Sequence, residues 1–262
     1  MEERKITCKN AASPSGLPGL AWALNPYRGC SHACRYCYAQ DVTRFEMGRD
    51  WGEVVEVKVN FVQMLSKQLA KRPKGTFGLG TVTDPYQPLE KKHELSRGCL
   101  IELRRAGSPV SVLTKSDLVL RDVDILSDLE GSEVGMSLGS VDENISALLE
   151  PGAPSPSKRL DALRRLSAEG VDTYVMAAPI VPGLSDSEES LRALVRMTER
   201  SGTRRIIWDK FNPKPMAGAR LRRALAAKSI ELGKSDDAWR ATVRGVLLDE
   251  CRDSSIELLD AF

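Results

Sequence analysis

Six short apolar or β-branched segments recur along the chain, at residues 20–25, 76–83, 110–114, 133–138, 173–181 and 205–211. Amphipathic segments with the apolar spacing of helices lie between them, at residues 61–71, 90–106, 117–129, 157–169 and 186–200. Strands that alternate with helices in this way indicate parallel βαβ units. We therefore predict an α/β fold in the form of a partial (β/α)6 TIM-type barrel. A doubly wound sheet is the alternative.

The length of the chain fits one such barrel. It has 262 residues, and residues 152–157 (GAPSPS) form a short loop rather than a linker between domains. We expect a single domain over residues 1–262, with a core at about 20–212 and a helical C-terminal extension at about 213–262.

The composition is that of a soluble globular protein, with 42% apolar and 28% charged residues. A net charge of +2 is too small to indicate a partner. No apolar run approaches the length of a membrane span, and the start MEERKITCKN lacks the features of a signal peptide. We expect a cytoplasmic protein with no membrane partner.

Three of the six cysteines gather in the segment NPYRGCSHACRYCYA, at residues 25–39. Cys30, Cys34 and Cys37 have the spacing C-x3-C-x2-C, and Tyr36 and Tyr38 flank the last of them. In a reducing compartment, clustered thiols favour metal binding over disulfides. The sequence therefore predicts a metal site on this segment.

The donor set of this site is incomplete for zinc. Structural zinc normally takes four protein ligands, whereas Cys8, Cys99 and Cys251 are remote and His32 is poorly placed to complete a tetrahedron. A 4Fe–4S cluster bound through three cysteines leaves one iron open to a further ligand. An open iron favours catalysis over a structural role. A zinc-binding interaction module remains the non-enzyme alternative.

The cysteine spacing, with an aromatic residue before the last cysteine, resembles the signature of the radical S-adenosylmethionine (SAM) superfamily. The segments TVTDPYQPLEKKHELSR, LTKSDLVLRDVDIL, LEPGAPSPSKRLDALRRL and APIVPGLSD resemble its spore photoproduct lyase-like branch, over about residues 20–190. The resemblance implies a 4Fe–4S cluster on the three cysteines, SAM on the open iron, and a 5′-deoxyadenosyl radical that abstracts hydrogen. It also implies a one-electron reductant similar to flavodoxin or ferredoxin. The substrate and the catalytic residues acting on it stay unknown.

Further cofactor contacts are expected at the carboxyl ends of the strands, where parallel α/β folds bind ligands. After the second segment, hydroxyl and carboxylate groups can bond the α-amino group of SAM, and their position at the barrel mouth favours this over the alternative, an Asp-Pro turn with capping threonines. After the third, Lys115 can pair with the SAM carboxylate. Similar enzymes place an arginine of the segment around Glu150 near the cofactor, and the end of the fifth strand against adenine. The candidate cofactor residues are Tyr36, Tyr38, Thr81, Thr83, Asp84, Lys115, Ser137, Arg159, Ala178, Pro179 and Ile180.

The chain departs from spore photoproduct lyase near the end of the second strand. There the lyase carries a cysteine that returns a hydrogen atom to the thymine radical, whereas Thr81 stands at the matching position. A threonine O–H bond is too strong to donate hydrogen readily. The resemblance therefore implies the same radical chemistry on a different substrate.

A nucleic-acid lyase, repair or RNA-modifying enzyme is the alternative function. Basic residues gather near the C-terminal end, with Trp208 and Phe211 among them, a combination that can follow a phosphate backbone. A solvated basic helix face explains the same pattern. The basic residues are Arg204, Arg205, Lys210, Lys214, Arg220, Arg222, Arg223 and Lys228.

Overall fold

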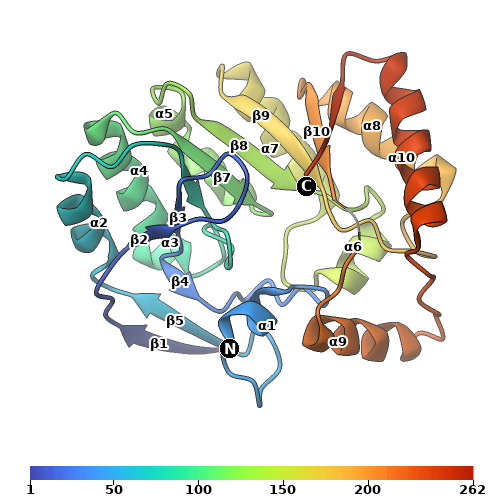
Figure 1. Ribbon diagram of the computed structural model, residues 1–262, viewed down its shortest axis with the longest axis horizontal. Coiled ribbons are helices and arrows are strands. Elements are labelled where there is room, and N and C mark those ends of the chain that lie inside the picture. Colours follow the sequence, from blue (N-terminus) through green and yellow to red (C-terminus); the bar gives the residue numbers. More distant parts are fainter. Residues whose placement is uncertain (210, 262) are drawn as a thin grey trace.

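The computed structural model describes residues 1–209 and 211–261. Within these residues, eight strands form the main sheet, in the order β11-β10-β9-β8-β7-β6-β3-β2 (Figure 1). Neighbours are parallel except for β2, which is antiparallel to β3. The strands are β2 (Ala12–Pro14), β3 (Trp22–Leu24), β6 (Phe77–Leu79), β7 (Val110–Thr114), β8 (Glu133–Ser137), β9 (Asp172–Ala177), β10 (Arg205–Trp208) and β11 (Glu257–Asp260).

The strand order confirms the predicted fold class. The six predicted strands correspond to β3, β6, β7, β8, β9 and β10, and they lie side by side in chain order. A doubly wound sheet would reverse its strand order at a switch point. The order between β3 and β10 has no such reversal, so the doubly wound alternative is wrong. The result is an open, mostly parallel sheet of the partial-barrel type.

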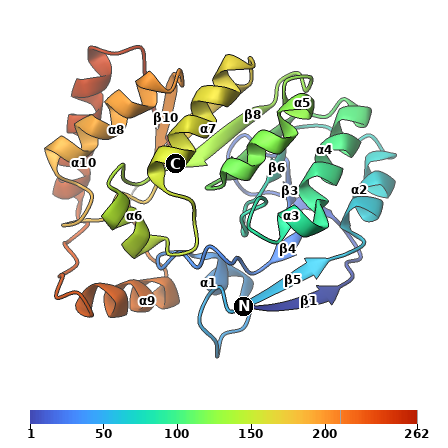
Figure 2. The same ribbon diagram turned by 180° about the vertical axis from the view of Figure 1, so that it is seen from behind.

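Helices cover one face of this sheet (Figures 1 and 2). In α7, Leu160, Leu163 and Leu166 face the core as their spacing predicts, and they are at most 7% exposed. Burying a leucine side chain contributes about 1.5–3 kcal/mol, so such faces hold the helices to the sheet. The covering helices are α2 (Phe61–Leu69), α4 (Leu95–Ala106), α5 (Val123–Leu126), α7 (Pro156–Ala168), α8 (Glu188–Arg200) and α10 (Asp237–Arg252).

A second, three-stranded sheet was not predicted. Its order is β1-β5-β4, with β1 (Glu2–Ile6) parallel to β5 (Val54–Lys58) and β4 (Tyr27–Arg28) antiparallel to β5. Because β4 ends two residues before Cys30, this sheet supports the start of the cysteine segment.

Several predicted elements are wrong in their bounds. The strand predicted at 76–83 ends at Leu79, since the next residue, Gly80, has a φ of +97°. The helix predicted at 90–106 breaks at Glu94, whose φ is +49°, into α3 (Glu90–His93) and α4. The helix predicted at 117–129 begins as a 3-10 helix, η1 (Asp117–Asp122), before α5.

The C-terminal extension differs from its prediction as well. It contains α9 (Pro215–Ala226) and α10, but also β11, which adds a strand to the main sheet beside β10. Two short helices, α1 (Ala39–Thr43) and α6 (Glu143–Leu149), complete the elements near the cysteine segment. None of the helices in the described part of the chain has the length and apolar character needed to cross a bilayer.

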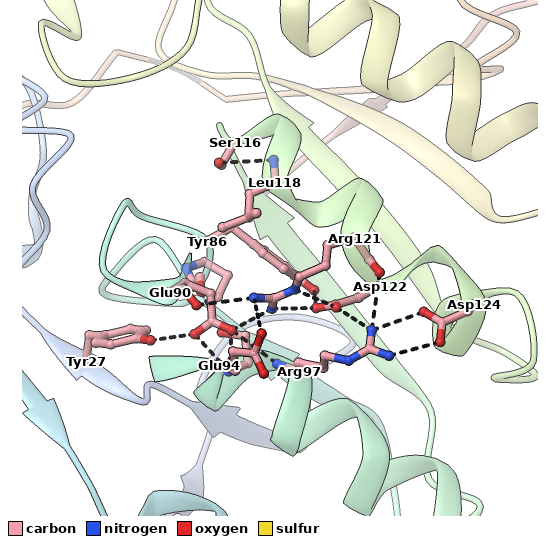
Figure 3. A network of polar contacts seen from close by, with 12 residues as sticks. Tyr27, Tyr86, Glu90, Glu94, Arg97, Ser116, Leu118, Arg121, Asp122 and Asp124 are labelled. Carbon is pink, nitrogen blue, oxygen red and sulfur yellow. Dashed lines mark hydrogen bonds and ion pairs between the residues drawn. The ribbon is translucent and has the colours of Figure 1, made fainter. Parts of the chain in front are cut away.

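A buried polar network joins β4 to the segments that follow β6 and β7 (Figure 3). Glu90 is fully buried and accepts hydrogen bonds from the Tyr27 hydroxyl and from the Ser96 N–H, the latter at 3.1 Å. The Arg121 guanidinium lies 2.7 Å from Glu90 and 2.8 Å from Asp122, so it bridges the two carboxylates. The network therefore fixes β4, and with it the start of the cysteine segment, against the rest of the fold.

Replacing Glu90 by alanine is expected to lower the free energy of unfolding by about 2 kcal/mol, because the buried donors lose their common acceptor. Glu94 is the matched control, since its side chain is 59% exposed and 3.8 Å from the same Arg121. Its alanine variant should change stability by less than about 0.5 kcal/mol. Urea unfolding followed by circular dichroism measures both, and equal values for E90A and E94A would contradict the role of the network.

Candidate metal centre

The three cysteines lie on one loop, between β4 and α1. Cys30 and Cys34 are each 6% exposed, Cys37 is half-buried, and all three are free thiols. Backbone hydrogen bonds close the loop, from the Ala33 N–H to the Cys30 carbonyl at 3.2 Å and from the Cys37 N–H to the Cys34 carbonyl at 3.1 Å. The loop begins at Gly29, where φ is +85° and a Cβ atom would lie 2.3 Å from the Val54 carbonyl oxygen, so only glycine fits.

Burial keeps these thiols protonated when no cation is bound. Burial raises the pKa of Cys34 to about 12, and it raises the pKa values of Cys30 and Cys37 as well. The other two cysteines are among the charges that raise the pKa of Cys30, so the three sulfur atoms lie within electrostatic reach of one another. Metal binding must deprotonate them, which a highly charged centre can do.

An unsatisfied donor lies beside the same loop. Trp51 is 5% exposed and packs in one apolar group with Cys30, with Cys37 beside it. Its indole N–H has no acceptor among the described residues. A buried donor without an acceptor is rare, and cluster sulfur atoms accept hydrogen bonds from such groups. The three thiols and this donor therefore fit a 4Fe–4S cluster.

No three His, Cys, Asp or Glu side chains within residues 1–209 and 211–261 stand close enough to share a single metal ion. In an iron–sulfur cluster, by contrast, each cysteine binds its own iron.

A buried charged group adjoins the loop, and it brings together four predicted residues from separate elements. Arg159 of α7 is 1% exposed, pairs with Glu150 and donates to the Ser137 carbonyl at 3.0 Å. The Tyr36 hydroxyl also donates to Glu150. The Lys115 ammonium lies 4.0 Å from Glu150 and 5.6 Å from the centre of the Tyr36 ring.

This group carries more positive than negative charge. Burial would lower the pKa of Lys115, and the negative charges of Glu150 and Asp84 counter it. Burial would raise the pKa of Glu150, whereas Arg159 and Lys115 hold it below its usual value. One carboxylate therefore faces two cations in a buried place. Such a place suits an additional carboxylate, because a buried charge needs a partner.

The backbone ties this group to the loop. The Arg35 N–H donates to the Leu149 carbonyl at 2.8 Å, and the Gly152 N–H donates to the His32 carbonyl at 3.0 Å. The connection between α6 and α7 is thereby held against the cysteine loop, and this places Glu150 beside Tyr36.

The predicted residues after β6 take part in contacts within the protein. The Thr83 hydroxyl donates to the Gly29 carbonyl at 2.7 Å, and the Thr81 hydroxyl accepts from Asn25 at 2.8 Å. The Tyr38 hydroxyl donates to the Thr81 carbonyl at 2.5 Å, so Tyr38 connects the end of the cysteine loop to the segment after β6. These bonds hold the loop to the end of β6, and a contact of these residues with a cofactor stays a prediction.

Asp84 connects the same loop to β7. Its carboxylate accepts from the Thr114 hydroxyl at 2.6 Å and from the Lys115 N–H at 2.8 Å, and it lies 3.2 Å from His32 Nδ1. Burial would raise the pKa of Asp84, but His32 and these hydrogen bonds hold it well below its usual value. His32 also lines a cavity of about 250 Å³ with Lys91, Ser116 and residues 151–154.

Of the predicted residues after β9, Pro179 lies beside Tyr36. Pro179 and Tyr36 line one narrow cavity together with Ser140 and Glu150. Ser137 donates to the Ala178 carbonyl at 3.2 Å, and Ile180 is fully buried in the main core. Lys115 and Pro179 thus lie beside Tyr36, and Ser137 is linked to Tyr36 through Arg159 and Glu150.

In the basic C-terminal segment the two aromatic residues are buried. Trp208 and Phe211 are 5% and 3% exposed, so neither ring lies open on the surface, and nucleic-acid binding by this segment stays a prediction. Arg205 pairs with Glu133 and Asp172, and Arg223 pairs with Asp50. Lys210 lies outside the described residues.

The sequence also missed two contributors to the loop, Trp51 and Arg220. The Arg220 guanidinium donates to the Cys37 carbonyl at 2.8 Å and to the Arg35 carbonyl at 3.1 Å. More than 180 positions separate Arg220 from these acceptors. No local signal could have linked them.

Comparison with known proteins adds a family and a fold. The model of the Radical SAM superfamily matches residues 24–195. An uncharacterized protein of Methanocaldococcus jannaschii is 37% identical over 184 residues, which are 70% of this chain and 70% of that protein. An uncharacterized protein of Mycobacterium tuberculosis is 36% identical over 211 residues, which are 76% of this chain but only 62% of that protein.

Among solved structures, spore photoproduct lyase complexed with dinucleoside spore photoproduct matches with a TM-score of 0.73 and 16% identity. The match covers 99% of this chain and 82% of that chain. At this identity the likeness concerns the fold alone.

Proposed function

The chain belongs to the radical SAM superfamily, and on this premise we propose that it binds a 4Fe–4S cluster through Cys30, Cys34 and Cys37 and cleaves SAM reductively. The observation that carries the proposal is the loop of three free thiols, two buried and one half-buried, beside a buried group with excess positive charge. The family relationship and the chemistry of the donor set support it together.

The residues of the chain have separate tasks in this proposal. When bound, the cluster and SAM supply one electron and a 5′-deoxyadenosyl radical for hydrogen abstraction. Lys115 and Arg159 hold the methionine carboxylate, because Glu150 neutralises only one of their two charges. Tyr36 and Pro179, which lie beside each other, are the proposed contacts of the adenine. The burial of this group keeps water from the reacting atoms.

Anaerobic reconstitution with iron and sulfide tests the proposal. The protein is expected to take up about four iron and four sulfide per chain and to show broad visible absorbance. With SAM and dithionite it should then release 5′-deoxyadenosine. Binding of one zinc per chain with no sulfide would instead support a zinc-binding module and contradict the proposal. Replacing dithionite by a flavodoxin or a ferredoxin tests the proposed one-electron partner.

A nucleic acid is the substrate class that we propose as second candidate. The solved relative with this fold carries a dinucleoside spore photoproduct, and Lys214, Arg222 and Lys228 are exposed in and beside α9. Thr81 stands where the lyase carries the cysteine that returns a hydrogen atom to the substrate radical. We therefore propose that the substrate radical of this protein reacts by another route. Binding of a labelled oligonucleotide should weaken steeply with salt if these residues contact phosphates. Salt-independent or absent binding would contradict this candidate.

A further inference from the structure

We propose that Arg220 of α9 is a positioning residue for the cluster, holding the second half of the cysteine loop and favouring the reduced state of the metal centre. The inference rests on the proposed function, because it assumes a cluster on Cys30, Cys34 and Cys37. It assigns a role in that centre to a helix outside residues 24–195, the region that matches the superfamily model.

Arg220 holds the loop at three points. Its Nη2 atom donates to the Cys37 carbonyl at 2.8 Å, its Nε atom to the Arg35 carbonyl at 3.1 Å, and its Nη1 atom to Gln40 Oε1 at 2.8 Å. Gln40 is 1% exposed and donates to the carbonyls of Glu46 and Arg49, so it is itself fixed. A planar guanidinium can serve these three acceptors at once, whereas an ammonium group offers its donors from a single nitrogen atom.

A second contact seats α9 against the same part of the chain. The Asp41 carboxylate accepts from the N–H groups of Met216 and Ala217, at 2.9 and 3.1 Å, in the first turn of α9. A carboxylate at a helix N-terminus is favourable for the exposed N–H groups and for the helix dipole. Asp41 belongs to α1, which begins two residues after Cys37. Figure 1 shows α1 and α9 side by side below the sheet.

Apolar packing completes the attachment. Leu221 and Leu225 of α9 are at most 1% exposed and form a core cluster with Leu149 and Val181, against which Tyr36 packs. The helix therefore cannot shift without disturbing Tyr36. Its position fixes the loop on both sides of Cys37.

The charge of Arg220 matters as well as its hydrogen bonds. The guanidinium is partly buried, and its hydrogen bond to the Cys37 carbonyl at 2.8 Å places its charge beside the cysteine loop. Reduction adds a negative charge to the cluster, and a nearby cation stabilises that charge. Charge, hydrogen bonding and solvent exposure are the means by which proteins set cluster potentials. Loss of the cation should therefore lower the midpoint potential.

The test compares R220Q, R220K and R223A with the wild type after anaerobic reconstitution. The measurements are iron and sulfide content, the rate of iron release to a chelator, and the midpoint potential from a redox titration followed by electron paramagnetic resonance. R220Q is expected to release iron about tenfold or more faster than the wild type and to have a lower midpoint potential. R220K should keep the wild-type potential but still release iron faster, because it retains the charge without the planar set of donors.

R223A is the matched control. Arg223 lies on the same helix with its side chain 68% exposed, and it pairs with Asp50 at 2.7 Å rather than with the loop. Its iron release and potential should equal those of the wild type. If R220Q does not fold, R220K carries the test, because fast iron release at an unchanged potential separates the two effects of Arg220.

Two different failures can be told apart. A wild-type protein that takes up no iron and sulfide contradicts the proposed function. A wild-type protein that takes them up, while R220Q matches it in iron release and in midpoint potential, overturns the role of Arg220 alone.

Discussion

Alanine in place of Cys30, Cys34 or Cys37 is expected to abolish SAM cleavage, reducing the release of 5′-deoxyadenosine to the background level. Each thiolate binds one iron in the proposed centre, and the histidine of the same loop, His32, faces Asp84 at 3.2 Å. A cluster that lacks one of three protein ligands is not retained. Because the chemistry depends on that cluster, the loss should be complete rather than partial.

The measurement is product release together with iron and sulfide content, for each single variant after the same reconstitution. Cys8 to serine is the matched control, because Cys8 is a free, half-buried thiol outside the loop. It should retain both cluster and activity. Each alanine variant removes a buried side chain as well, so circular dichroism of the apoprotein must show an intact fold. A folded C34A protein with a full complement of iron and sulfide would refute the assignment of the ligands.

The six central strands of the main sheet, β3 and β6 to β10, could be predicted because they are largely buried and therefore mostly apolar. Residues 110–114, predicted as a strand, coincide with β7, which is buried at four of its five positions. Strand β1, with the sequence EERKI, has two exposed and three half-buried residues, and it exists through its backbone pairing with β5, about 50 positions away. Strand β11 is short and half-buried, and it is likewise defined by its neighbour β10. No local sequence pattern predicts a strand that is defined by its pairing partner.

The candidate site likewise contains some residues that a local sequence pattern predicts and others that only tertiary contacts bring together. The cysteine segment could be recognised because its ligands are close in sequence, and their number and spacing carry the chemistry. Glu150 is decisive in the buried charged group, but only the folded chain shows that one carboxylate serves Tyr36, Lys115 and Arg159. Contacts from Arg220 and Trp51 depend wholly on tertiary packing. Sequence alone therefore indicated the proposed cofactor, and the structure indicates how the cysteine loop is held.

Replacing Arg159 by methionine is expected to lower the free energy of unfolding by about 3–5 kcal/mol, the cost of removing one partner of a buried ion pair. The loss follows because Glu150 stays 5% exposed with only Lys115 as its cation, and the carbonyl of Ser137 loses its donor. For a chain of this size the melting temperature should fall by roughly 10 °C. The double variant E150Q/R159M should lose less than the sum of the two single losses, since the partners are coupled.

The pH dependence of the free energy of unfolding tests whether the charge of Glu150 is the source of this stability. Its pKa lies below the usual 4.5, held there by Arg159 and Lys115 against the effect of burial. A carboxylate with a lowered pKa stabilises the fold above its unfolded-state pKa and loses that contribution as the pH falls through the folded-state value. The stability difference between the wild type and E150Q should therefore be constant from neutral pH down to about 4.5 and should shrink below it.

The control for R159M is R164M on the same helix. The Arg164 side chain is 61% exposed and pairs with Asp161 at 2.7 Å across one turn of α7. An exposed pair contributes little, so this variant should change the free energy of unfolding by less than about 0.5 kcal/mol. Thermal and urea unfolding of both variants separate the burial of the ion pair from the mere loss of an arginine. Equal losses in R159M and R164M would mean that Arg159 does not serve the buried group, and the proposed carboxylate site for SAM would lose its second cation.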